Sequence, residues 1–177
     1  MATKKRTIAP KKDATMNEST PQATPQVVRN ILGIDPGNTQ SAYVVYNTDQ
    51  QIILEKNIVP NQELLSSLKW LCVVEDVHVY IEMVASYGMA VGKEIFETVF
   101  WVGRYYQELT RENVDVALIF RKEVKLAMCG SMRAKDKNIR QACLDILGKE
   151  KCKGVARDMW SALAICLTVE SMQKEAI

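Results

Sequence analysis

Residues 31–40 read ILGIDPGNTQ, and this stretch decides how the rest of the chain can be interpreted. A short apolar run ends in Asp35, and Pro36 and Gly37 turn the backbone immediately afterwards, as at the end of a β-strand. The carboxylate is therefore expected at a fixed place on the edge of a sheet, where it can hold a cation. An Asp that only starts a hairpin turn explains the same pattern, so the segments that follow have to decide.

The length and composition predict a soluble protein with one main domain. The chain has 177 residues, 47% of them apolar, and no apolar run approaches the roughly 18 residues needed to cross a bilayer. Its five cysteines lie far apart, form no C-x-x-C pair and share the sequence with one histidine. That pattern argues against a zinc cluster and a disulfide framework, and it favours buried thiols in a reducing compartment.

The net charge of +2 hides a segregation of charge along the chain. Residues 31–120 carry five basic and twelve acidic residues, whereas residues 121–157 carry eleven basic and four acidic residues. Lys and Arg gathered in one segment suit a polyanion such as nucleic acid, because phosphate contacts need positive charge on one surface. A solvated basic face is the alternative.

Residues 1–29 are expected to be a disordered basic tail, and residues 30–177 the folded domain. The first segment is poor in aromatic residues, rich in Lys, Thr, Pro, Gln and Ala, and without periodicity. It lacks the apolar region of a secretory signal. A flexible arm that adds nonspecific nucleic-acid affinity and an inert tail are both open interpretations.

The folded part is predicted to be an α/β domain with a mixed five-stranded sheet. β-Branched and aromatic runs predict strands at residues 29–35, 41–46, 51–57, 77–82 and 114–120. Apolar residues at helical spacing predict helices at residues 61–71, 88–113, 134–147 and 156–173. The order β-β-β-α-β-α-β-α-α describes an antiparallel meander on one side of the sheet, with helices on both faces.

The helix expected at residues 88–113 has a wide apolar face, and Gly103 is expected to let it approach the sheet closely. That face consists of Ile95, Phe96, Val99, Val102 and Tyr106. Phe100 and Trp101 on the same helix are most simply core residues as well.

Three carboxylates can meet at one edge of this sheet. Asp35 ends the first strand, Glu82 ends the fourth, and Asp158 is expected in the first turn of the last helix. If the first and fourth strands are neighbours, two of these carboxylates converge and the helix can deliver the third. Such oxygens suit Mg²⁺ or Mn²⁺, and two ions about 4 Å apart can activate water for phosphodiester cleavage.

Four segments of the sequence stand in a recognisable order. They are GIDPGNT, then YIEM with SYGMAVGKEIFETVFWVGR, then RKEVKLAMCGSMRAKDKNIRQACLDILG, then ARDMWSALAICL, from about residue 30 to 170. Together they resemble the RuvC family of Holliday junction resolvases, particularly the shorter RuvC-like proteins of phages. The resemblance implies the ribonuclease H-like fold and a homodimeric, Mg²⁺-dependent endonuclease that cuts branched DNA in the cytoplasm of a bacterial or phage-infected cell.

Asp35 and Glu82 match the first two catalytic acids of the family, but the last helix departs from its pattern. Bacterial RuvC proteins carry two acids there, three residues apart, whereas this chain has Asp158 followed by Ser161. Three explanations are open. Three acids can suffice to bind the metal, Asp136 can contribute the fourth carboxylate from the preceding helix, or the nuclease activity is weak. The competing role for Asp136 is the N-cap of that helix.

Basic residues of segment 121–157 are expected to position the DNA backbone, helped by the exposed N–H groups at the start of the penultimate helix. The candidates are Arg133, Lys135, Lys137 and Arg140 around that helix start, and Lys149, Lys151 and Lys153 in the following loop. Lys125 resembles a basic position of the family, and a surface Lys on a short helix is its plain alternative.

Two further residues have open roles. Tyr87 follows Glu82 and can either stack on an exposed base, as a nearby aromatic residue does in RuvC, or close the turn before a helix. His78 shares a strand face with Glu82, and a core or edge histidine is its simpler interpretation.

The helix expected at residues 88–113 carries more apolar side chains than its packing on the sheet needs. Some of them can form the two-fold contact that two opposed cuts require.

Other classes of protein share part of this pattern. A D-x-G-x-T turn also cradles phosphate in actin-like ATPases and sugar kinases, but those need a second lobe with its own D-x-G, which this short chain lacks. A non-cleaving protein that binds branched DNA is the alternative that Ser161 suggests. A processing or RNA-directed nuclease of the same fold is a weaker one.

Overall fold

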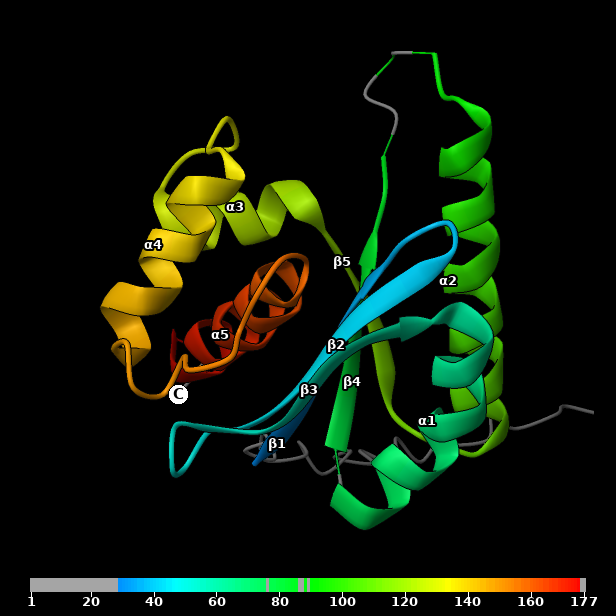
Figure 1. Ribbon diagram of the computed structural model, residues 1–177, viewed down its shortest axis with the longest axis horizontal. Helices are drawn as coiled ribbons and strands as arrows, with labels where there is room; N and C mark the ends of the chain where they lie inside the picture. The colour runs from blue at the N-terminus through cyan, green and yellow to red at the C-terminus, as the bar shows by residue number, and fades with distance from the viewer. Residues whose placement is uncertain (1–28, 76, 86–87, 89, 176–177) are drawn as a thin grey trace, which may run out of the picture.

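The computed structural model describes residues 29–75, 77–85, 88 and 90–175 (Figure 1). The strands of this part are β1 (Asn30–Pro36), β2 (Gln40–Asn47), β3 (Ile52–Pro60), β4 (Val77–Met83) and β5 (Val116–Phe120). The helices are α1 (Asn61–Glu75), α2 (Lys93–Arg111), α3 (Arg121–Cys129), α4 (Asp136–Leu147) and α5 (Met159–Glu175). Apart from residue 29, the expected tail lies outside the described residues.

The five strands form one mixed sheet in the order β3-β2-β1-β4-β5. β1, β2 and β3 pair antiparallel as a meander, and β4 and β5 continue the sheet parallel to β1. The predicted mixed five-stranded sheet is therefore confirmed. The condition on which the candidate site depended, that β1 and β4 are neighbours, is met.

Helices cover both faces of the sheet (Figure 1). α5 lies directly on one face with α3 and α4 outside it, and α1 and α2 cover the other face. Side chains alternate between the two layers along β1, since Ile31 packs in the α5 layer and Leu32 in the α1–α2 layer. The sheet thus separates two apolar cores.

α5 is the central helix of its layer, and all residues from Ala162 to Glu170 are buried. A helix that is apolar on every side has to be enclosed, and here the sheet and the two outer helices enclose it. None of the helices in the described ranges is both long and apolar enough for a membrane span. The expectation of unpaired thiols is confirmed, because all five cysteines are free and four of them are buried.

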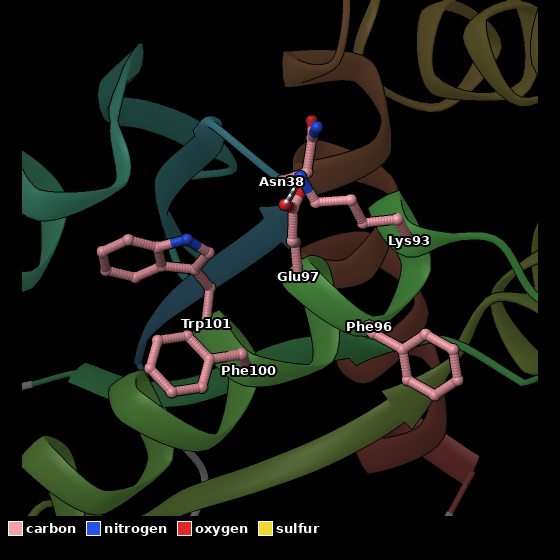
Figure 2. A pocket seen from close by; sticks show the side chains of 6 residues that line it. All are labelled: Asn38, Lys93, Phe96, Glu97, Phe100 and Trp101. Atoms are coloured by element: carbon pink, nitrogen blue, oxygen red, sulfur yellow. Dashed lines mark ion pairs between the residues drawn. The ribbon is translucent and has the colours of Figure 1, made fainter.

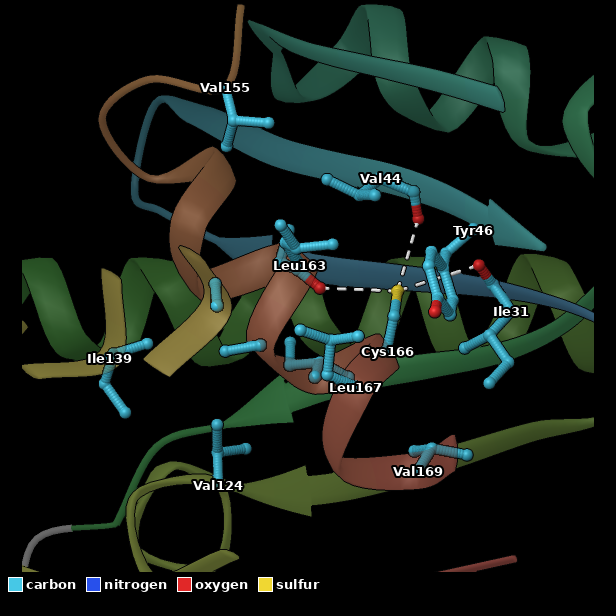
Figure 3. Close-up of a cluster of buried hydrophobic side chains, with 14 of the residues drawn as sticks. Ile31, Val44, Tyr46, Val124, Ile139, Val155, Leu163, Cys166, Leu167 and Val169 are labelled. Carbon is cyan, nitrogen blue, oxygen red and sulfur yellow. Dashed lines mark hydrogen bonds between the residues drawn. The ribbon is translucent and has the colours of Figure 1, made fainter. Parts of the chain in front are cut away.

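β1 and α5 approach each other closely at Gly33. A Cβ atom there would lie 2.4 Å from the carbonyl oxygen of Ala162 and 2.8 Å from Sγ of Cys166. The Cys166 thiol in turn reaches the carbonyl oxygens of Ile31 and Val44, at 3.7 and 3.6 Å (Figure 3). Only glycine fits at this contact, which fixes the first turn of α5 against the strand that ends in Asp35.

One helix was not predicted. α3 starts directly after β5, with no turn residue between them to mark a new element. Its start is held by the carboxylate of Glu123, which accepts a hydrogen bond from the backbone N–H of Phe120 at 2.8 Å. It ends at Gly130, which has the left-handed φ of 64° that favours glycine.

α2 begins at Lys93 instead of residue 88, and it turns a different face to the sheet than expected. Its buried residues are Thr98, Val102, Tyr105 and Leu109. The exposed large side chains on it include Ile95, Phe96, Phe100 and Tyr106. The core interpretation is therefore wrong for these four, while the alternative, that part of this apolar face forms a two-fold contact, stays a prediction. The close approach expected at Gly103 is wrong as well, because a Cβ atom added there would meet no neighbouring atom of the described residues within 4 Å.

Hydrogen bonds explain why polar residues of α2 are buried in place of apolar ones. The hydroxyl of Thr98 donates to the carbonyl oxygen of Glu94 at 2.9 Å, and that of Tyr105 donates to the carbonyl oxygen of Asn61 at 3.2 Å. A buried hydroxyl with a partner carries little desolvation cost. Hydrophobic spacing alone cannot reveal such partners.

We expect Gly33→Ala to destabilise the protein by about 1–3 kcal/mol, because the added methyl group has to push α5 away from β1. The matched control is Gly103→Ala, where the methyl group enters open space in a helix and is expected to add up to about 1 kcal/mol of stability. Thermal unfolding followed by circular dichroism measures both. An unchanged melting temperature for Gly33→Ala would contradict the close contact.

Candidate active site

Three parallel strands end at the same edge of the sheet, and each brings one charged side chain there. Asp35 lies at the end of β1, Glu82 at the end of β4, and Arg121 directly after β5. Ile34 of β1 pairs with Ile81 of β4, so the two acids follow side by side. Because side chains alternate along a strand, both acids lie on the face that α5 covers.

The start of α5 completes this edge. Asp158 immediately precedes the helix instead of lying in its first turn, and its carbonyl oxygen accepts hydrogen bonds from the N–H groups of Ser161 and Ala162 at 3.0 and 3.2 Å. The Ser161 side chain lies close enough to Asp35 to lower the pKa of that carboxyl group. Arg157, one residue earlier, has the left-handed φ of 50°, a conformation that costs energy for a residue other than glycine and is frequent at functional sites.

Asp35, Asp158 and Ser161 line an open cavity of about 530 Å³. Basic side chains share its wall, and they are Lys137, Arg140, Arg157 and Arg121. A water molecule occupies about 30 Å³ of liquid, so the cavity has room for a hydrated cation together with a phosphodiester group. Acidic and basic side chains that line one cavity form a site that suits a phosphate held next to a metal.

Arg121 bridges the acids of this edge. Its Nη1 donates to both carboxylate oxygens of Glu82, at 2.9 and 3.3 Å, and its Nη2 donates to Oδ1 of Asp136 at 2.8 Å. Nη1 also lies 3.5 Å from Oγ of Ser161. The guanidinium group therefore joins residues of β4, α4 and α5.

The crowding of carboxylates changes their acidity. Burial raises the pKa of Asp35 well above its usual range, and the nearby charges of Glu82 and Asp158 raise it further, against the opposing effect of Arg121. Burial also raises the pKa of Glu82, while Arg121 and Lys125 oppose that shift. Negative charge is therefore poorly compensated around Asp35, the acid between the other two.

This charge distribution fits a hydrated divalent cation. Within the described ranges, no three His, Cys, Asp or Glu side chains are grouped closely enough to form a complete metal site. Mg²⁺ does not require one, because it keeps several waters and commonly binds through one or two carboxylates plus substrate phosphate. Asp35 and Asp158, which face the same cavity and interact electrostatically, provide such a pair.

Asp136 lies beside this site through its ion pair with Arg121. It is the first residue of α4, and Lys135 occupies the N-cap position. The N-cap interpretation of Asp136 is therefore wrong. The backbone N–H of Lys135 is instead satisfied by the side chain of Asn138, at 3.0 Å.

The predicted DNA-binding residues separate into three groups. Lys137 and Arg140 line the cavity, and half-buried Lys125 lines a small pocket together with Glu82. The other basic candidates are exposed on the surface but do not line the cavity, and they are Arg133, Lys135, Lys149, Lys151 and Lys153. Tyr87 lies outside the described residues.

His78 has no place in the site. Its Nδ1 lies 2.9 Å from a carboxylate oxygen of Asp115, at the other end of β4 from Glu82. The simpler interpretation, a histidine with an edge partner, is confirmed.

Two site residues were missed in the sequence, Arg121 and Arg157. Arg121 follows a strand without any motif, and only the knowledge that β5 is parallel to β4 places it beside Glu82. Arg157 directly precedes Asp158, and this adjacency was the one available signal.

We expect Asp35→Asn to stabilise the metal-free protein at high pH. The pKa of Asp35 is higher in the folded than in the unfolded chain, so the fold favours the protonated carboxyl group. The contribution of this group to the free energy of unfolding is complete below about pH 4 and is lost as the pH rises through the raised pKa. In EDTA, the melting temperature of the variant should exceed that of the wild type by at least about 2 °C at pH 9, the effect of about 1 kcal/mol. The difference should shrink towards pH 4; a wild type that is the more stable at pH 9 would contradict the crowding.

Known structures identify the fold that carries this site, although no family model and no curated protein matches the sequence. RuvC from Thermus thermophilus matches with a TM-score of 0.67 at 18% identity, over 82% of this chain and 96% of that one. T. thermophilus RuvC in complex with a Holliday junction substrate matches with 0.67 at 20%, over 83% and 96%. The yeast mitochondrial Holliday junction resolvase Ydc2 matches with 0.54 at 11%, over 84% and 82%. The chain therefore has the ribonuclease H-like fold of the RuvC resolvases, as its sequence predicted.

Proposed function

We propose that this protein is a divalent-metal-dependent endonuclease that hydrolyses phosphodiester bonds in branched DNA such as Holliday junctions. The observation that carries the proposal is the meeting of Asp35 and Glu82, from neighbouring parallel strands, with Asp158 at the start of α5 beside a cavity with a basic wall. The likeness to RuvC bound to a Holliday junction substrate supports the choice of DNA.

The acids are proposed to form the metal-binding edge, with Asp35 at its centre because it interacts with both Glu82 and Asp158. These carboxylates would hold Mg²⁺ or Mn²⁺, which would supply an activated water and positive charge at the leaving oxygen. Ser161 is proposed to orient Asp35, which it lies beside, and Asp136 holds Arg121 by an ion pair. No side chain is required as a covalent nucleophile.

The basic wall of the cavity is proposed to hold the DNA backbone. Lys137, Arg140 and Arg157 lie at the cavity itself, close to the acids. The more distant basic residues extend the positive surface along α4 and the loop after it, and Lys125 lies next to Glu82. Contacts of this kind fix the register of a duplex without reading its bases.

A homodimer is proposed because a junction with two-fold symmetry needs two active sites in one particle. The outer face of α2 offers a surface for a second copy. Phe96 and Phe100 are 64% and 63% exposed there and line, with Trp101, a cavity of about 670 Å³ (Figure 2). Lys93 and Glu97 beside them pair at 3.3 Å, so the surface suits an apolar partner better than a polyanion.

A non-cleaving protein that binds branched DNA is the second candidate. The observation in its favour is that Glu82 already has a cationic partner in Arg121 while Ser161 stands where bacterial RuvC proteins carry an acid. Cleavage is the property that separates the two candidates.

Paired nicks at the branch point are expected when the wild type meets a synthetic four-way junction in Mg²⁺ or Mn²⁺, and linear duplex of the same sequence should stay intact. Asp35→Asn should lower the cleavage rate by at least about 100-fold, since it removes the central carboxylate, and still bind the junction. Denaturing gels measure the nicks and mobility shifts measure binding. Binding by both proteins without nicks would favour the non-cleaving candidate, and absence of binding would exclude both.

Phe96→Glu combined with Phe100→Glu is expected to convert the dimer into a monomer, because it places charge in the proposed contact. Trp70→Glu, on the exposed surface of α1 at 57% exposure, is the matched control and should leave the dimer intact. Sedimentation velocity or light scattering gives the mass. A dimer in both variants would place the two-fold contact elsewhere.

A further inference from the structure

Arg121 interacts with both Glu82 and Asp35. Its guanidinium group donates to both oxygens of Glu82 and is close enough to Asp35 to lower the pKa of that carboxyl group. Both Glu82 oxygens accept hydrogen bonds from Arg121, so they cannot hold a divalent cation in the same direction at the same time. A buried carboxylate with this partner already has its compensating charge.

The position of Arg121 is built into the fold. The side chain starts from the first residue of α3, immediately after β5, and Glu123 fixes that helix start by its hydrogen bond to Phe120. At its far end the guanidinium group is held by Asp136 at 2.8 Å. It is therefore anchored by three elements and differs from a surface arginine, whose ion pair contributes little.

Asp35 is accessible from the larger cavity. Asp35 and Asp158 both line this cavity of about 530 Å³, and Arg121 forms part of its wall, whereas Glu82 lines the small neighbouring pocket with Arg121. Glu82 thus has an arginine as its cation, while the pair of Asp35 and Asp158 is open to solvent and substrate.

We infer that Arg121 takes the place of one divalent cation, so that the chain binds a single divalent ion, on Asp35 and Asp158, and supplies the second positive charge itself. This inference rests on the proposed function and narrows it: Glu82 acts through Arg121 and is not a metal ligand. It also explains why Ser161 can stand where bacterial RuvC proteins carry an acid. With Arg121 in place of the second cation, this position has no second metal to bind. Arg121 is therefore a positioning residue: it supplies a fixed positive charge next to the carboxylates of Asp35 and Glu82.

The test is the number of Mn²⁺ ions that the full-length chain binds without DNA, measured from the free Mn²⁺ signal in electron paramagnetic resonance. The wild type should bind one ion, and Arg121→Gln should bind two, because Glu82 is released. Arg121→Lys keeps the charge and should bind one. Arg111→Ala, which removes an exposed arginine paired with Glu108, is the matched control and should also bind one.

Two carboxylate variants keep the test decisive if Arg121→Gln does not fold. Glu82→Gln should bind its ion within about threefold of the wild-type affinity, whereas Asp158→Asn should bind it at least about tenfold more weakly, a change of about 1.4 kcal/mol. Two ions in the wild type, one ion in a folded Arg121→Gln, or loss of the ion in Glu82→Gln would each overturn the inference.

Failure of the inference and failure of the proposed function give different results. A wild type that cuts junctions and binds two ions would refute the role of Arg121 and leave the nuclease intact. A wild type that binds one ion and cuts nothing would refute the nuclease and leave the assignment of Arg121 standing.

Discussion

The contact of β1 with α5 at Gly33 is the constraint on which the candidate site depends. No side chain fits between the strand and the carbonyl oxygen of Ala162, so the helix lies directly on the backbone of the strand. The same strand ends in Asp35 two residues later, and the same helix begins just after Asp158. A glycine therefore sets the separation of two carboxylates that lie far apart in the sequence.

The sequence predicted the sheet, its meander and the meeting of Asp35 with Glu82, because strand ends leave a strong local pattern and parallel neighbours end at one edge. It did not predict the face that α2 buries, since Thr98 and Tyr105 owe their burial to hydrogen-bond partners that the spacing of apolar residues does not reveal. Nor did it predict Arg121, whose role depends on a strand pairing that no local pattern encodes. Residues whose position depends on strand pairing or on a hydrogen-bond partner were thus harder to predict than residues marked by a local sequence pattern.

Gathering acids at one edge has an energetic cost that the fold accepts. Burial and mutual repulsion disfavour the charged form of Asp35, and in the metal-free chain Arg121 and Ser161 offset part of this effect. Sites of this kind usually sacrifice stability for function. The two apolar cores on either side of the sheet supply the stability that the edge lacks.

The residues of the site come from five parts of the chain: β1, β4, the start of α3, the first half of α4, and the segment that leads into α5. None of them is brought together by a local turn or a single helix, so the site does not exist until the parallel half of the sheet has paired and the last helix has docked. Long-range contacts of this type form slowly, because the loops that they close are long. During synthesis, a chain that ends before residue 157 would lack Arg157, Asp158 and Ser161, and with them part of the lining of the cavity. The candidate site is consequently complete only after the whole sheet has paired and the last helix has docked.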